Sequence, residues 1–311
     1  MTLQKILTVP RSVLFSLALA FAACVAQAQT YPNWPNTFVY AYPAASSTDV
    51  AWRAVVQEAS RGLGLDIVMR AKPDGYTIGG YSNAQLVVML PIDPKLAIEP
   101  GKDYVSLVLG LETYLLMVAR ADAPFKDVKG LIAYAKANPG KINAGSPGAG
   151  AGSHLGLAMV STQAGIEYTH IPYKGAAPAL HAMLAGEFDV MFTDLLAKPY
   201  IDSGRMVGLG VSGSTRWDLF PGMPALQDAG LGGFLSLSGS GVMAPPGIPE
   251  DVAARLNRAF NETFPAPEVR ARLEATGRIL RGGTMQEAPS LIRADIERYR
   301  PVIKTADILL N

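Results

Sequence analysis

The twelve residues THIPYKGAAPAL, Thr169 to Leu180, place the end of an expected strand directly before a Lys-Gly turn and an alanine-rich helix. Gly175 permits a tight turn because glycine carries no Cβ. Pro178 suits the first turn of the helix, where the N–H that proline lacks would have had no partner. A strand that passes through a short turn into a helix is the repeating unit of α/β folds. This stretch therefore predicts the fold class.

The same alternation continues along the chain and predicts a two-lobed protein. Apolar runs that end in glycine, serine or proline alternate with segments of helical periodicity, which is typical of parallel strands joined by helices. Two long, nearly uncharged β-like runs, residues 105–120 and 234–243, would carry the chain between two lobes. We place the second lobe at residues 121–240 and build the first from residues 29–120 and 241–311. The expected strands are residues 37–42, 77–81, 141–145, 168–173, 188–193 and 207–212, and the expected helices are residues 48–60, 128–137, 154–164, 178–185 and 249–264.

Residues 1–28 have the pattern of a secretory signal peptide. Lys5 and Arg11 precede an apolar run that ends in Ala26-Gln27-Ala28, and we expect cleavage after Ala28. The run is too short for a convincing membrane-spanning helix, which needs about 20 apolar residues. Lipoprotein processing at Cys24, the single cysteine of the chain, is the alternative, although the preceding Phe21 argues against it. The mature protein is therefore expected in the periplasm and without disulfides.

Composition excludes several classes of function. The chain has 311 residues, 49% of them hydrophobic, and a formal net charge of +1, which fits one or two compact α/β units. It carries neither a basic stripe for nucleic acid nor an acidic tail. Its three histidines, His154, His170 and His181, lack the partners of a zinc site, and the ordinary interpretation of each is a surface or hydrogen-bonded side chain. We expect no metal and no organic cofactor.

Three expected strand-to-helix turns have the composition of anion-binding sites. In the first, residues 42–49, Ser46 and Asp49 form a capping-box pair at the start of a helix. The second, residues 146–154, contains three glycines that let the backbone approach a ligand, but it lacks both the dinucleotide fingerprint and the P-loop ending. The third is the turn at residues 173–175 of the opening stretch. Plain helix capping and ordinary loops are the alternatives, but helix N-termini that converge at one sheet edge favour a small anion.

A serine hydrolase is the catalytic alternative. Residues 144–148 resemble the G-x-S-x-G nucleophile elbow around Ser146, with alanine in the first position. Such enzymes place an acid and then a histidine after the serine. Glu167 is the only acid between Ser146 and His181, which is too close in sequence for a typical triad. Asp189, Asp194 and Asp202 lie near expected strand ends, where exposure or helix capping explains them. We therefore expect no enzyme.

Several motifs resemble those of the substrate-binding receptors of tripartite tricarboxylate transporters, the TctC or Bug (Bordetella uptake gene) family. Residues 42–49 resemble the family's aromatic-Pro-Gly-Gly-Ser-Thr-Asp loop, and residues 72–77 match its APDGYT motif except at Lys72. Residues 172–180 match PYKGAAPAL letter for letter, and residues 131–155 and 242–257 are similar to two further family motifs. The resemblance covers nearly all of the mature chain.

This resemblance implies a fold, a function and a set of site residues. The fold is a two-lobed periplasmic-binding-protein fold of type II, a Venus flytrap with its ligand cleft between the lobes. The function is capture of a small organic carboxylate by a non-enzymatic monomer, which delivers it to membrane transporter subunits or presents it to a sensor kinase. The ligand-binding positions carried over from the family are Tyr42, Ser46, Ser47, Thr48, Asp49, Ser146, Gly148, Gly150, Ser153, His154, Tyr173, Lys174, Gly175 and Asp194.

The chain departs from the family pattern in three places. Ala45 and Ser46 replace the paired glycines of the first loop, which narrows its backbone conformations. Phe192-Thr193-Asp194 stands for the family's Phe-Asp-Asn, so the acid moves by one residue and to the other face of a strand. Residues 61–65 replace a strand and a glycine-rich loop, and a lost strand would expose unpaired amides. The alternatives are a receptor of altered specificity and a degenerate or sensor-type paralogue.

Overall fold

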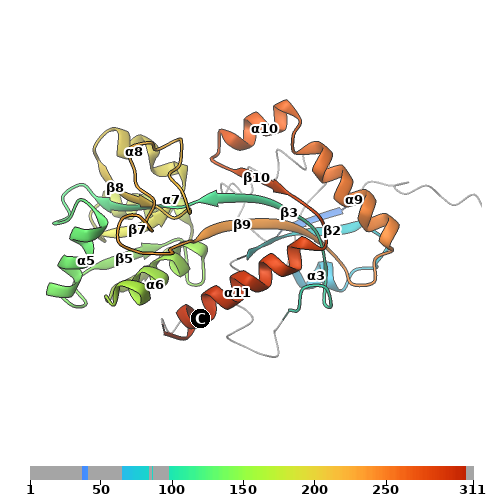
Figure 1. Ribbon diagram of the computed structural model, residues 1–311, viewed down its shortest axis with the longest axis horizontal. Helices are drawn as coiled ribbons and strands as arrows, with labels where there is room; N and C mark the ends of the chain where they lie inside the picture. The colour runs from blue at the N-terminus through green and yellow to red at the C-terminus, as the bar shows by residue number, and fades with distance from the viewer. Residues whose placement is uncertain (1–36, 41–64, 84–85, 87–97, 306–311) are drawn as a thin grey trace, which may run out of the picture. The chain divides into compact units, whose positions relative to one another are not determined.

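The computed structural model describes residues 37–40, 65–83, 86 and 98–305 (Figure 1). Three predictions lie outside this range: the signal peptide of residues 1–28, the first turn at residues 42–49 and the helix at residues 48–60. The described chain forms two β-sheets with helices packed against them. This arrangement confirms the α/β class that the strand-turn-helix pattern predicts.

The first sheet joins strands from both ends of the described chain. Its order is β1 (Thr37–Tyr40), β2 (Thr77–Ser82), β9 (Leu237–Ala244), β3 (Val105–Tyr114) and β10 (Ile279–Gly282). β1 and β2 run parallel, and the other neighbours run antiparallel. β1 pairs with β2 residue for residue, from Thr37 opposite Thr77 onward. Within the described residues, the sheet therefore has no gap between β1 and β2, the strands on either side of the shortened segment.

The second sheet lines up three parallel strands in its first half. Its order is β6 (Thr169–Pro172), β5 (Asn143–Ser146), β7 (Val190–Thr193), β4 (Leu116–Arg120) and β8 (Met206–Val211). β5 is parallel to both β6 and β7, whereas β4 is antiparallel to β7 and β8. Because parallel strands end at the same edge, the turns after β5, β6 and β7 meet there.

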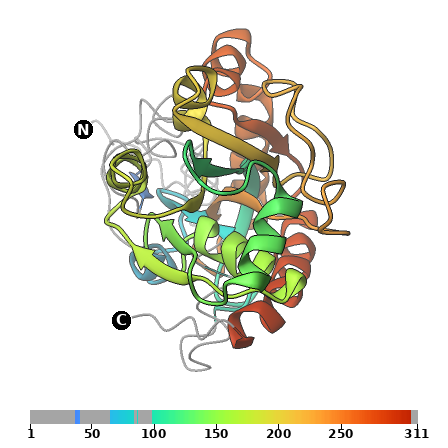
Figure 2. The ribbon, with the colours of Figure 1, turned by 90° about the vertical axis from the view of Figure 1, so that its left-hand side faces the viewer.

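Helices cover both faces of the second sheet. α5 (Val128–Ala137) and α6 (Gly152–Ala164) pack on one face with Ala144 and Phe192. α7 (Ala176–Leu184) packs on the other face with Met191 and Val118, as expected from the alternation of strand side chains. Figure 2 shows these helices to either side of the strands. The remaining helices are α3 (Leu65–Met69), η1 (Leu195–Ala197), α8 (Lys198–Asp202), α9 (Glu250–Thr263), α10 (Pro267–Glu274) and α11 (Glu287–Thr305).

Most predicted elements are confirmed, with shifts at their ends that local chemistry explains. α5 has the predicted bounds because the Asp127 side chain accepts the N–H of Gly130 at 2.7 Å and caps it. α6 ends as predicted because Gly165 adopts a left-handed φ of 61°. α7 begins two residues before the predicted Pro178, directly after Gly175, so this proline still lies in the first turn. Among the described helices, none is both long enough and apolar enough to cross a membrane.

The chain passes between the two sheets at Leu115, which separates β3 from β4. Its N–H donates to Ser212 Oγ and its carbonyl accepts the N–H of Ser212, both at 2.8 Å, so the crossing is fixed by a buried serine. β4, which the predicted boundary at residue 120 assigns to the first lobe, therefore pairs with β7 and β8 in the second sheet. The lobe boundaries themselves remain a prediction.

Gly145, in β5, lies against the ring of Phe188. A Cβ added at Gly145 would lie 2.2 Å from Phe188 Cζ and 2.5 Å from Cε1, which is closer than any real carbon contact. Phe188 is 1% exposed, so its ring cannot turn out into solvent. Glycine is therefore required here by packing and not by its backbone conformation.

We predict that Gly145→Ala lowers the free energy of unfolding by about 1–3 kcal/mol, the usual cost of overpacking a core. Gly232→Ala is the matched control, since nothing lies within 4 Å of its added Cβ. Urea denaturation measures both. Adding Phe188→Leu to Gly145→Ala should recover part of the loss in a double-mutant cycle. Equal stabilities of the Gly145 and Gly232 variants would contradict the packing argument.

Candidate functional site

The second and third predicted turns come together at the carboxyl edge of the second sheet. The N–H of Tyr173 donates to the carbonyl of Ser146 at 2.8 Å, and the N–H of Gly175 donates to the carbonyl of Pro147 at 2.9 Å. A Cβ at Gly148 would lie 3.6 Å from the Tyr173 carbonyl, so the two turns are also in van der Waals contact. The structure thus joins two turns whose bonded residues, Ser146 and Tyr173, lie 27 positions apart in sequence.

Two helix N-termini at this edge carry no negative charge of their own. α6 begins after Ala151 and α7 after Gly175, and neither helix has a side-chain cap or an acidic residue in its first turn. α5 differs, because Asp127 caps it. The first N–H groups of a helix have no partner within the helix and bear a partial positive charge. Two uncapped N-termini that follow turns bonded to each other therefore favour an anion.

Two buried hydroxyls near these termini have no hydrogen-bond partner within the described structure. Ser153 lies in the first turn of α6 and is 6% exposed, and Thr193 ends β7 and is 4% exposed. A buried hydroxyl without a partner costs about 1–3 kcal/mol in proteins, so such groups mark places where a ligand or water completes the bonding. Ser153 is a predicted site residue, whereas Thr193 is not.

Asp194, the predicted acid next to Thr193, has a local structural task. Its Oδ1 accepts the N–H of Leu196 at 3.0 Å and caps η1. Helix capping is the alternative that the sequence offers for this residue. The hydroxyl of Thr193, one position earlier, is the group left without a partner at the end of β7. A threonine as the last strand residue before a capping aspartate is the signal that sequence reasoning missed.

Ser146 and two histidines form a cluster of hydrogen bonds and stacked rings beneath the second turn. Ser146 Oγ lies 2.7 Å from His170 Nε2, donates to the carbonyl of Gly148 at 2.9 Å and accepts the N–H of Gly148 at 3.2 Å. His154 Nδ1 accepts the N–H of Gly150 at 3.1 Å. The two imidazole rings stack with centroids 3.7 Å apart and planes 8° from parallel. The interpretation of both histidines as hydrogen-bonded side chains is confirmed.

The surroundings of these histidines favour their neutral forms. Burial, together with the smaller effect of the neighbouring His170, lowers the pKa of His154 to about 4. Burial also lowers the pKa of His170. With Ser146 fully buried and His154 9% exposed, neither side chain presents an open surface to a ligand. The structure thus places both predicted residues behind the turn and not on its outer surface.

Tyr173 and Lys174 lie at the outer side of the third turn. The Tyr173 hydroxyl donates to Glu187 Oε2 at 2.9 Å, and its ring packs against Phe188 at a centroid distance of 5.5 Å. Burial raises the pKa of Tyr173, and its bond to Glu187 raises it further. Lys174 is exposed. The first-lobe residues Tyr42, Ser46, Ser47, Thr48 and Asp49 lie outside the described residues, so their place in the site stays a prediction.

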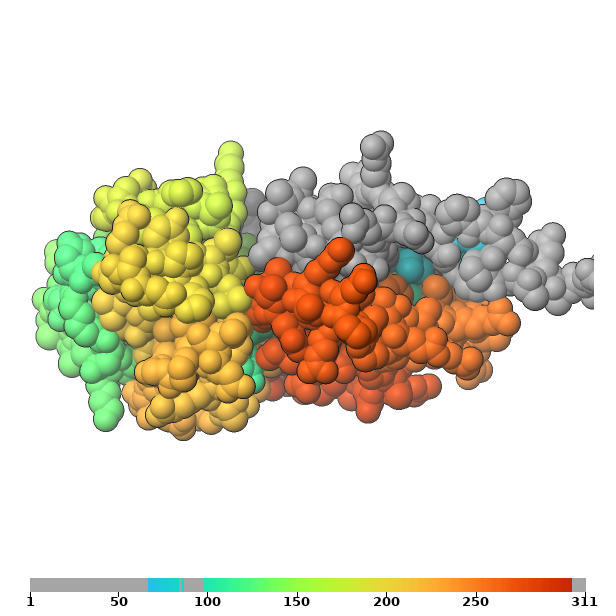
Figure 3. All heavy atoms as spheres, turned by 90° about the horizontal axis from the view of Figure 1, so that it is seen from above, coloured from blue at the N-terminus to red at the C-terminus, as the bar shows by residue number. Residues whose placement is uncertain are grey.

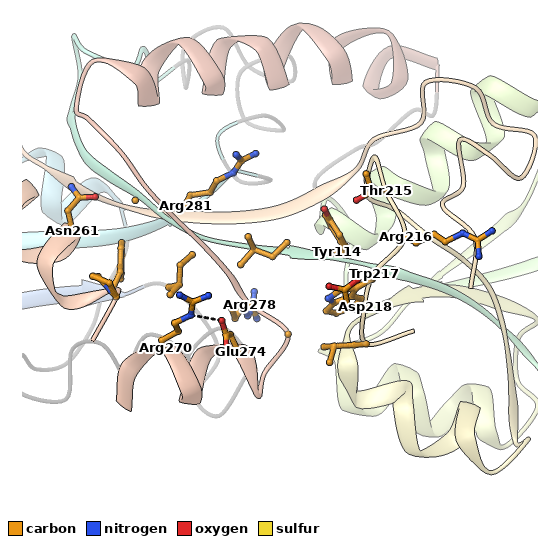
Figure 4. Close-up of a pocket in the computed structure, with 17 residues that line it drawn as sticks. Tyr114, Thr215, Arg216, Trp217, Asp218, Asn261, Arg270, Glu274, Arg278 and Arg281 are labelled. Atoms are coloured by element: carbon orange, nitrogen blue, oxygen red, sulfur yellow. Dashed lines mark hydrogen bonds and ion pairs between the residues drawn. The ribbon is translucent and has the colours of Figure 1, made fainter. Parts of the chain in front are cut away.

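A groove of about 820 Å³ lies elsewhere in the fold and was not predicted (Figures 3 and 4). Tyr114 at the end of β3 and residues 215–219 after β8 line it from one side. Residues of α9, α10 and β10 between 261 and 282 line it from the other. None of the described site residues from the sequence lines this groove. Its walls come from segments far apart in the chain, which local patterns do not connect.

Two arginines of the groove form ion pairs with neighbouring glutamates. Arg270 pairs with Glu274 and Arg281 with Glu112, both at 2.7 Å, and Figure 4 shows the first pair on the wall opposite Tyr114. These pairs leave less positive potential for an anion than the count of arginines suggests.

At one end of the groove, the turn between α10 and β10 contacts η1 and the segment after β8. Gly277, with a φ of +70°, has Leu195 and Trp217 within 2.8 Å of an added Cβ, and its carbonyl accepts the Thr113 hydroxyl at 2.8 Å. We interpret the groove as the space beside the contact of Gly277 with Leu195 and Trp217.

Comparison with known proteins identifies the family. The family model of the tripartite tricarboxylate transporter family receptor matches residues 54–308. A relative from Pseudomonas sp. strain P51, described as the UPF0065 protein in the tcbD-tcbE intergenic region, is 31% identical over 94% of this chain and 93% of its own. A solved structure of a periplasmic transporter is 27% identical, covers 90% of this chain and 100% of its own, and has a TM-score of 0.79.

MatC from Rhodopseudomonas palustris, solved with bound malate, is 26% identical, covers 88% of this chain and 100% of its own, and has a TM-score of 0.76. These likenesses confirm the expected periplasmic-binding-protein fold. The chain belongs to the tripartite tricarboxylate transporter receptor family.

Proposed function

We infer that this protein is an exported, non-enzymatic receptor that binds a small organic carboxylate and delivers it to a membrane transporter. The observation that carries the proposal is the edge of the second sheet, where α6 and α7 begin without side-chain caps and where the hydroxyls of Ser153, in α6, and Thr193, at the end of β7, are buried without a partner. Backbone N–H groups and hydroxyls are the donors that a carboxylate needs, and no cationic side chain has to be buried with it.

Family membership supports the receptor role and the periplasmic location. The relative MatC was solved with malate, which makes a dicarboxylate the first ligand to test. In the proposed complex the hydroxyls of Ser153 and Thr193 and the first N–H groups of α6 and α7 bind the ligand. Residues 173–175 form a side wall, and residues 42–49 of the first lobe close over it. A ligand that contacts both lobes only in the closed state shifts the population toward closure.

The hydrolase alternative has one observation in its favour, the 2.7 Å contact of Ser146 Oγ with His170 Nε2. Two others oppose it. Ser146 Oγ donates its proton to the Gly148 carbonyl and not to His170, and within the described structure no carboxylate is seen to bond to His170 in the way that orients a catalytic histidine. A buried structural contact explains the pair better than a catalytic one.

We predict that a dicarboxylate raises the melting temperature of the mature protein. Ligand at a hundred times its Kd stabilises the folded state by about 2.7 kcal/mol, which corresponds to roughly 5 °C or more for a chain of this size. Differential scanning fluorimetry with malate, longer dicarboxylates, aromatic acids and amino acids measures the shift. A sharp melt that no compound moves would point to the degenerate paralogue.

We predict that Ser153→Ala and Thr193→Val each weaken carboxylate binding about tenfold, since each removes one hydrogen bond to a charged group. Both changes leave a buried site with fewer unpartnered polar atoms, so the protein should remain as stable as wild type or become more stable. Isothermal titration calorimetry gives the affinity. Ser214→Ala, at an exposed serine, is the matched control and should bind like wild type. Unchanged affinity in both site variants would remove this edge from the site.

Ser146→Ala separates the receptor from the hydrolase. In a receptor, the change loosens the second turn and weakens binding without abolishing it. In a hydrolase, it abolishes turnover of ester substrates. Assays of wild type and variant with a chromogenic ester panel, beside the calorimetric titration, should show binding without turnover. Wild-type hydrolysis that the variant loses would overturn the proposal.

A further inference from the structure

His154 and His170 reach the glycine-rich turn from beneath and hold it at two points. His170 projects from β6, opposite Ala144 of β5, and reaches Ser146 at the end of β5. His154 projects from α6 and reaches back to the Gly150 N–H inside the turn. Gly148 and Gly150 have positive φ values. Glycine adopts such values readily but also adopts others, so these two residues do not hold the turn in one conformation by themselves. The start and the middle of the turn are therefore each tied to one imidazole ring.

The hydrogen-bond inventory of Ser146 fixes the form of His170. A hydroxyl has one proton and two acceptor sites. Because Ser146 Oγ donates its proton to the Gly148 carbonyl, it accepts from His170 Nε2–H and from the Gly148 N–H. All three positions of the hydroxyl are then in use. The Ser146 side chain thus acts as a connector between the histidine of one strand and the backbone of the turn.

The bond to Gly150 requires His154 to be neutral at Nδ1. This nitrogen accepts the Gly150 N–H, so a proton placed on it would set two N–H groups against each other. Stacking at 3.7 Å adds a second restraint, because a charge on one ring disfavours a charge on the other. The titratable groups that line the small cavity beside the rings are Glu167, Tyr168 and the two histidines themselves. Glu167 is exposed, and burial raises the pKa of Tyr168.

We propose that His154 and His170 are positioning residues that hold the Ser146–Gly150 turn in its ligand-binding conformation without touching the ligand. This assignment rests on the proposed function, since it explains how that site is shaped. It changes the role expected for His154, whose ring faces the cavity lined by Tyr168 and His170. It also gives His170, which no motif singled out as a site residue, a part in binding.

The test compares variants that remove each bond with variants that keep it. Leucine removes the polar atom at either position. Asn at 154 places its side-chain oxygen where Nδ1 lies and does not titrate, and Gln at 170 places its amide where Nε2–H lies. The set is therefore His154→Leu, His154→Asn, His170→Leu and His170→Gln. His181→Leu, at the exposed third histidine on α7, is the matched control.

The first readout is amide hydrogen exchange of the ligand-free protein. We expect His154→Leu to raise the exchange rate of the Gly150 amide at least tenfold and His170→Leu to raise that of Gly148 by a similar factor. The Asn and Gln variants and His181→Leu should exchange like wild type. This readout needs no ligand, so it decides the inference even if malate does not bind. Unchanged exchange in both Leu variants overturns the proposal.

The second readout is the Kd for malate. At pH 7.5 the Leu variants should bind at least tenfold more weakly than wild type, with recovery in the Asn and Gln variants. If Asn and Gln are as weak as Leu, the rings act by filling space and the proposal is wrong. No binding by wild type to malate or the wider panel counts against the proposed function alone.

The third readout is the pH dependence of binding, which also serves if a Leu variant fails to fold. The pKa of His154 lies near 4, so its bond to Gly150 persists at neutral pH and is lost as the pH falls toward that value. Between pH 6 and pH 4, wild type should lose affinity more steeply than His154→Asn. Titration of malate itself affects both proteins equally and cancels in the comparison. Parallel pH profiles overturn the role of His154.

Discussion

The parallel alignment of β5 with β6 is the constraint on which the candidate site depends. It pairs Ser146 with Pro172, so that the turns after the two strands begin at the same position along the strand direction. Two backbone hydrogen bonds then join the turns, from Tyr173 to Ser146 and from Gly175 to Pro147. Because these bonds use only main-chain atoms, they fix the neighbourhood of the helix N-termini whatever the side chains are. The anion binding proposed for this edge would therefore follow from backbone geometry.

The features that could be predicted from the sequence are those whose signals are local. Gly175 and Pro178 mark the third turn because each residue type is matched to a backbone conformation within a few positions. The same holds for α5, where Asp127 stands just before the apolar periodicity begins. The glycines of the second turn predict a close backbone approach to a ligand, which stays a prediction; in the structure Gly148 lies beside the Tyr173 carbonyl. Turns and caps are chosen locally, so a single sequence contains them.

The features that were missed depend on pairs of residues far apart in the chain. The sequence around His170 does not indicate that its ring stacks on that of His154 in α6. This contact forms only when α6 packs on the sheet. Likewise the break at Leu115 is enforced by Ser212, nearly a hundred residues later, and no residue next to it marks the end of β3. The unpartnered hydroxyl of Thr193 is visible only when its surroundings are known. These features arise from tertiary packing, which a local sequence pattern does not contain.

Ordering a glycine-rich turn costs conformational entropy, and the proposed role of the histidine pair is to order this turn before a ligand binds. Glycine loses more backbone freedom on ordering than any other residue, so a loose turn would lose that freedom each time a ligand bound and affinity would fall. In the role proposed for them, His170 and His154 impose this order during folding, through their bonds to Ser146 and Gly150. Under this proposal the ligand meets a turn whose shape is already set. Gly148 and Gly150 contribute close approach without the entropy penalty that glycine normally brings to binding.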